Sequence, residues 1–242
     1  MEDARTADLD AVLGGLVAAA TVAFGGELVA AVLFGSAAEG RLRPTSDVNL
    51  VWVLTKVDPA ALDRLREPLR VAQSMVGARS MFLALDELPA AAELFAVKFA
   101  DIKGRHRLLH GRDVLAGLTI DDGALRRGLR EVLLNLSLRL RERYVLLSLR
   151  EEQLVPVIAD AAGPLRAAAS ALLRLQGRVA PSPREALEQA AAVTGDPVLI
   201  DAVAALSTAR QEQRLPPGVA GPTLLALSLL AGRLRVALEG GA

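Results

Sequence analysis

The residues best suited to chemistry lie in one stretch, VLFGSAAEGRLRPTSDVNLVWVL, at 32–54. Gly35 and Ser36 follow an apolar run, and a turn there that opens a short helix would offer backbone N–H groups and a hydroxyl to phosphate oxygens. Asp47 and Asn49 stand two residues apart where the next apolar run begins. Side chains at i and i+2 of a strand share a face. We therefore expect both to point toward the phosphate cradle, where acidic oxygens would hold Mg²⁺ against a nucleotide.

The loop between these two pairs contains further candidate ligands. Gly40 lets the chain leave the short helix, and a basic segment follows it. Arg41 and Arg43 either pair with a triphosphate as bidentate donors or are simply solvated. Ser46 directly precedes Asp47 and belongs to the same candidate nucleotide site.

A two-metal site needs a third carboxylate from a neighbouring strand. The strand expected after the intervening helix, SMFLAL at 80–85, contains no acid. Asp101, on a further expected strand at 95–102, is the best substitute. The alternative is an aspartate at a strand end that is paired with Lys103 or Arg105.

The elements that must position these residues fall into two parts. Buried strands are expected at 28–34 and 48–54, because both are continuous apolar runs. Helices are expected at 6–24 and 59–76, the second opened by Asp58 as N-cap and Pro59 at the first helical position. Beyond residue 119 only amphipathic helical patterns follow. We expect one domain at 1–118 and a C-terminal helical bundle at 119–242.

Composition excludes several classes of function. Lys+Arg and Asp+Glu both number 28 in the 242 residues, so no global charge draws the chain to nucleic acid or an anionic membrane. The absence of cysteine excludes disulfides and thiolate metal sites. The apolar stretch at 11–38 follows an acidic segment and is divided by glycines, so we expect a buried helix and strand in a cytoplasmic protein. The preference for arginine over lysine, together with the abundance of Ala and Leu, suggests a bacterial source.

The motif resembles the signature of the nucleotidyltransferase superfamily, which includes DNA polymerase β, kanamycin-type aminoglycoside nucleotidyltransferases and the minimal nucleotidyltransferases. That signature is an apolar strand, Gly-Ser-x-x-x-Gly, a short loop, and Ser-Asp-x-Asp opening a second strand. Gly35, Ser36, Gly40, Ser46 and Asp47 match it by type and spacing. At the position of the second aspartate of this signature, the chain has Asn49. The resemblance implies an α+β fold with a mixed sheet flanked by helices, followed by the all-α bundle.

Two functions follow from the resemblance. The first is transfer of a nucleoside monophosphate from an NTP to a hydroxyl of a small molecule or protein, with Mg²⁺ held by Asp47, Asn49 and Asp101. The second is a catalytically depleted module that binds nucleotide or a protein partner, which Asn49 and the acid-free third strand favour. We expect no membrane partner and no nucleic-acid template. A homodimer through the helical part stays open.

Overall fold

The computed structural model describes residues 2–40 and 47–238 of the chain. They divide into two compact units. The sheet unit comprises Met1–Leu94 and Phe99–Ile120, and the helical unit comprises Phe95–Lys98 and Asp121–Ala242. Each unit is described separately below.

A mixed four-stranded sheet forms the centre of the sheet unit. Its strands are β1 (Leu28–Phe34), β2 (Val48–Leu54), β3 (Ala78–Ala84) and β4 (His106–Gly111), in the order β3-β2-β1-β4. β1 is antiparallel to both β2 and β4, whereas β2 and β3 are parallel. The register between β1 and β4 shifts between Ala31 and Val32. The mixed sheet confirms the expected fold class.

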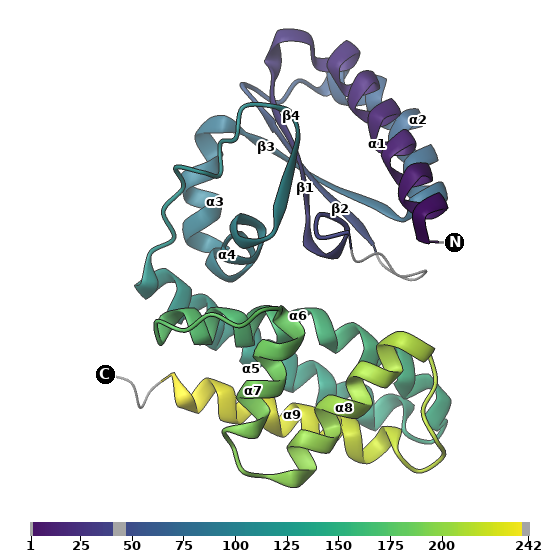
Figure 1. Ribbon diagram of the computed structural model, residues 1–242, viewed down its shortest axis with the longest axis vertical. Helices are drawn as coiled ribbons and strands as arrows, with labels where there is room; N and C mark the ends of the chain where they lie inside the picture. Colours follow the sequence, from purple (N-terminus) through teal and green to yellow (C-terminus); the bar gives the residue numbers. More distant parts are fainter. Residues whose placement is uncertain (1, 41–46, 239–242) are drawn as a thin grey trace. The chain divides into compact units, whose positions relative to one another are not determined.

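Helices α1 (Glu2–Phe24) and α2 (Pro59–Val76) lie side by side against one face of this sheet (Figure 1). α2 begins as its sequence predicts, because the Asp58 carboxylate accepts from the N–H groups of Ala60 and Ala61. It ends at Gly77, whose φ of 66° is left-handed. α3 (Leu88–Leu94) and the later part of α4 (Ala96–Gly104) lie on the other side of the sheet (Figure 1).

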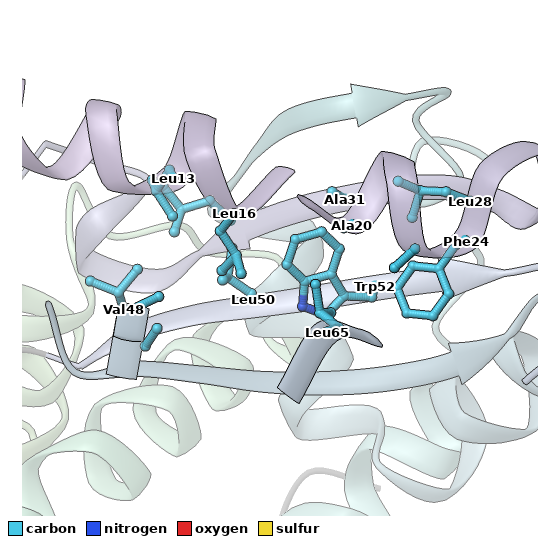
Figure 2. Packing of buried hydrophobic residues seen from close by; sticks show 14 of the residues in the cluster. Leu13, Leu16, Ala20, Phe24, Leu28, Ala31, Val48, Leu50, Trp52 and Leu65 are labelled. Carbon is cyan, nitrogen blue, oxygen red and sulfur yellow. The ribbon is translucent and has the colours of Figure 1, made fainter. Parts of the chain in front are cut away.

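Alternate residues of β2 point into the core between the sheet and helices α1 and α2. Figure 2 shows Val48, Leu50 and Trp52 turned toward the same cluster as Leu16 of α1. Trp52 is 0% exposed, and its indole Nε1 donates to Ser80 Oγ at 2.9 Å. Trp52 is therefore a core residue of the sheet unit.

Within the described residues, one helix, Asp8–Glu27, is long and apolar enough to cross a membrane by length and composition. Leu13, Leu16 and Ala20 of this helix are buried in the core cluster of the sheet unit (Figure 2). The helix expected from the sequence is observed, and one of its faces is buried against this core, whereas the other is exposed.

The prediction of a strand at 95–102 is wrong, because this segment belongs almost entirely to the helix α4. Phe99 and Ile102 are both 0% exposed and lie three residues apart, on one face of a helix. The fourth strand is instead β4, which directly follows at His106–Gly111.

The helical unit contains five α-helices among the described residues: α5 (Asp122–Leu147), α6 (Leu154–Leu175), α7 (Pro183–Ala192), α8 (Pro197–Glu212) and α9 (Ala220–Ala237). α5 packs against α6 and α9, and α6 also packs against α7 and α8. The capping signals predict the starts of two helices correctly: Ser182 Oγ accepts from the Glu185 N–H, and the Asp196 side chain accepts from Val198. The short 3₁₀ turns of the chain are Gly25–Glu27, Gly35–Ala37, Leu85–Glu87 and Glu151–Gln153.

Candidate functional site

The Gly-Ser turn forms directly after β1. Gly35 has φ of 78° and Gly40 has φ of 69°, a left-handed conformation that glycine adopts without steric cost. No atom within 4 Å would obstruct a Cβ at either glycine, so the backbone conformation rather than space requires the residue. Between them the chain makes the 3₁₀ turn Gly35–Ala37.

Two amides of this turn are used by the protein itself. The Gly35 N–H donates to the Arg105 carbonyl at 3.0 Å, and the Gly40 N–H donates to the Ala37 carbonyl at 3.3 Å. The expectation that Gly35 offers its own amide to phosphate is therefore wrong. The first N–H groups of a helical turn have no acceptor within it, so Ser36 and Ala37 provide the amides at this position.

Arg105 holds the turn through its side chain as well as its backbone. Its Nη2 donates to both carboxylate oxygens of Asp101 at 2.7 Å, and its Nη1 donates to Glu39 Oε2 at 3.1 Å. Burial alone would lower the pKa of Arg105, but the charges and hydrogen bonds of Asp101 and Glu39 outweigh it and raise that pKa. Asp101 is therefore paired with Arg105, which is the alternative to metal binding that the sequence left open.

The start of β2 brings Asp47 and Asn49 to the end of β1. Asn49 pairs with Phe34 of β1 on one side and with Arg79 of β3 on the other. Arg79 Nε lies 3.1 Å from Asp47 Oδ1, and Asn49 Nδ2 donates to the Asp47 carbonyl at 3.4 Å. Because Val48 points into the core, Asn49 and Arg79 lie on the opposite face of the sheet.

The side chains at this end of the sheet do not suit a divalent cation. Among the described residues, no group of three or more His, Cys, Asp or Glu could hold a metal ion. Asp47 already faces a guanidinium, Asn49 is neutral, and Asp101 is bound to Arg105. Mg²⁺ prefers carboxylate oxygens and sheds its water reluctantly. The three residues expected to share the metal therefore do not fit it.

Arg41, Arg43 and Ser46, which the sequence also predicts as nucleotide ligands, lie outside the described residues. Sequence reasoning named Arg105 only as a possible partner of Asp101 and did not identify Arg79. Arg79 directly follows the first residue of β3 and is the strand partner of Asn49, a relation that depends on the register.

A second polar pair lies beside the turn. His106 of β4 pairs with Phe34 of β1, and its Nε2 is 3.2 Å from Asp113 Oδ2. Burial alone would raise the pKa of Asp113, but hydrogen bonds from His106 and from the N–H groups of Leu115 and Ala116 lower it below its usual value. His106 belongs to the outer strand β4, which forms most of the basic segment KGRHRLLHGR at 103–112.

Comparison with known proteins identifies the fold. No family model matches the chain, and no curated protein matches it in sequence. In structure it is similar to the spectinomycin adenyltransferase AAD(9) from Enterococcus faecialis, solved as a crystal structure with ATP and spectinomycin. The match has a TM-score of 0.64 and 14% identity, and it covers 93% of this chain and 98% of that one. A likeness at this identity shows the fold alone: the chain has a nucleotidyltransferase-like fold, with a four-stranded mixed sheet and helices followed by a mostly helical part.

Proposed function

We propose that the chain binds a nucleoside triphosphate at the 3₁₀ turn Gly35–Ala37. The observation that carries this proposal is the placement of the turn, where β1 ends beside the start of β2. The amides of Ser36 and Ala37 have no acceptor within the turn, and they lie beside the half-buried side chain of Ser36 at one end of the sheet. Backbone N–H groups at such a turn bind phosphate oxygens well. The ATP bound to the similar spectinomycin adenyltransferase supports a nucleotide as the ligand.

The second candidate function is the transfer of a nucleoside monophosphate to a hydroxyl of a small molecule or protein. The structural match favours it, because it extends over both parts of an enzyme solved with ATP and spectinomycin. The side chains at 47, 49 and 101 stand against it, since they do not fit Mg²⁺. We therefore place nucleotide binding first.

Calorimetric titration of the purified chain with ATP, GTP, CTP and UTP tests the first candidate. We expect at least one of them to bind, and Ser36→Ala to weaken that binding about threefold to tenfold, because one hydrogen bond to phosphate is lost. Ser74→Ala, at an exposed position of α2, is the matched control and should bind as the wild type does. Failure of all four nucleotides to bind would contradict the proposal.

A transfer assay decides between the two candidates. The chain is incubated with labelled ATP, Mg²⁺ or Mn²⁺, and hydroxyl acceptors that include spectinomycin. If the site is a binding module, nucleotide binds but neither labelled acceptor nor pyrophosphate forms. Formation of an adenylylated acceptor would instead establish the transferase.

A further inference from the structure

Arg79, the second residue of β3, places a positive charge at the candidate site. Arg79 is the strand partner of Asn49, and its Nε lies 3.1 Å from the Asp47 carboxylate. We infer that Arg79 is the resident cation of this site and that its guanidinium, instead of a divalent metal ion, receives the phosphates of a bound nucleotide. This inference rests on the proposed nucleotide binding and adds the residue that balances the negative charge of the bound phosphates.

The sheet topology places Arg79 near the turn. β1 ends and β2 begins at the same end of the sheet because they are antiparallel, and β3 begins there because it is parallel to β2. Phe34, Asn49 and Arg79 are neighbours across three strands. With strands roughly 4.8 Å apart, the backbone of Arg79 lies about 10 Å from the residue before the turn. A polyphosphate at the turn is within reach of a side chain as long as arginine.

The donors of this pair suit a phosphate better than a metal ion. Asp47 carries one negative charge, which Arg79 balances, and Asn49 contributes none. Because the pair has no net charge, it supplies neither the paired carboxylates that hold Mg²⁺ nor a net attraction for a divalent ion. A phosphate would meet a guanidinium, whose planar set of donors suits phosphate oxygens.

The ion pair with Asp47 uses only part of the N–H donors of the Arg79 guanidinium. Its side chain is 70% exposed and that of Asp47 is 45% exposed, so both face solvent. The described ion pair uses Nε, whereas a guanidinium carries five N–H donors in all. An exposed pair of this kind contributes little to stability. Replacing Arg79 therefore tests ligand binding without endangering the fold.

The test measures ATP binding by calorimetry in excess EDTA and in excess MgCl₂. The wild type should bind equally well in both, within about twofold. Arg79→Gln should lose at least about tenfold in affinity in EDTA, the effect of removing a charge-assisted hydrogen bond. Arg70→Gln is the matched control: Arg70 is 76% exposed and also lies in an exposed ion pair, on α2. It should bind as the wild type does.

A double variant tests whether a metal site can replace the cation. Asn49→Asp combined with Arg79→Gln puts two carboxylates on one face and removes the cation, so ATP binding should become dependent on Mg²⁺. Bound Mn²⁺, measured by electron paramagnetic resonance without nucleotide, should appear in the double variant and not in the wild type. Equal Mn²⁺ binding by both proteins would overturn the inference.

The remaining outcomes separate the two proposals. If EDTA abolishes ATP binding by the wild type and Mg²⁺ restores it, the inference is wrong and nucleotide binding stands. If Arg79→Gln binds ATP in EDTA as tightly as the wild type, Arg79 is not the cation that meets the phosphates. If no nucleotide binds under either condition, the proposed function itself is overturned, and the inference with it.

Discussion

Arg105 connects three parts of the candidate site. Its carbonyl accepts the N–H of Gly35, and its guanidinium binds Asp101 of the preceding helix α4 and Glu39 in the segment after the turn. The side chains of all three charged residues are at most 24% exposed. Arg105 therefore acts on the turn as a positioning residue, because it fixes the backbone that presents the amides of Ser36 and Ala37.

Replacing this arginine should loosen the turn. Arg105→Gln leaves two partly buried carboxylates without their cation, so we expect the free energy of unfolding to fall by about 2 kcal/mol. Urea denaturation followed by Trp52 fluorescence measures it. Arg66→Gln, which removes an exposed pair with Asp63 on α2, should change the same quantity by less than about 0.5 kcal/mol. Equal effects of the two variants would contradict the positioning role.

Individual residues of the site could be predicted from the sequence only where backbone conformation or strand alternation determines them. The left-handed glycines Gly35 and Gly40 follow from the turn that the motif requires. Side-chain pairing across strands does not, because it depends on the register of β2 against β3. Arg79 lies thirty-odd residues beyond Asp47 in the sequence, and no local pattern connects the two.

At the scale of elements, the helical unit has a cap that joins two of its segments. Glu151, in the 3₁₀ turn before α6, accepts from the N–H of Gly218 at 2.7 Å and from that of Ala220 at 2.8 Å. These backbone hydrogen bonds lower the pKa of Glu151 below its usual value of 4.5. The carboxylate thereby fixes the start of α9, whose first N–H groups lack acceptors within the helix.

This cap predicts a dependence of stability on pH. The pKa of Glu151 is lower in the folded chain than in the unfolded one, so its contribution is present above pH 4.5 and is lost as the pH falls through the folded value. Glu151→Gln should lower the thermal midpoint of the helical unit at neutral pH. The difference from the wild type should shrink below pH 4.5. Thermal scans by circular dichroism measure it, and Glu152→Gln should retain the wild-type profile.

The elements themselves could be predicted well where burial is complete. β1 and β2 are apolar throughout except for Asn49, because both faces of their sheet are covered, and their bounds agree with those predicted. β4 is an outer strand with exposed and half-buried residues, so it lacks an apolar run. The neighbouring segment at 95–102 has apolar residues that fit both a strand and a helix, and such short runs do not distinguish the two.

At the scale of the whole molecule, the chain has two units, each with its own buried core. Trp52 is the one tryptophan of the chain and lies in the sheet unit. Its fluorescence therefore reports the sheet unit, whereas the circular dichroism of helices reports both units. Chains with more than one such unit often depart from two-state unfolding.

We expect two thermal transitions that single substitutions shift separately. Ser80→Ala leaves the buried Trp52 N–H without its acceptor, so it should lower the transition seen by fluorescence, by about 1–3 kcal/mol in unfolding free energy. Glu151→Gln should shift the other transition and leave the fluorescence midpoint unchanged. One transition that moves with both substitutions, observed by both probes, would contradict independent unfolding.

The order β3-β2-β1-β4 leaves two outer strands with one unpaired side each. Unpaired strand edges recruit strands from other molecules unless they are short, irregular or charged. β4 is irregular and charged: its register against β1 shifts, and its Arg107 is bound to Asp10 of α1. β4, the outer strand beside the turn Gly35–Ala37, is thereby protected from edge-to-edge aggregation, and concentrated solutions of the folded chain should not seed fibrils through it.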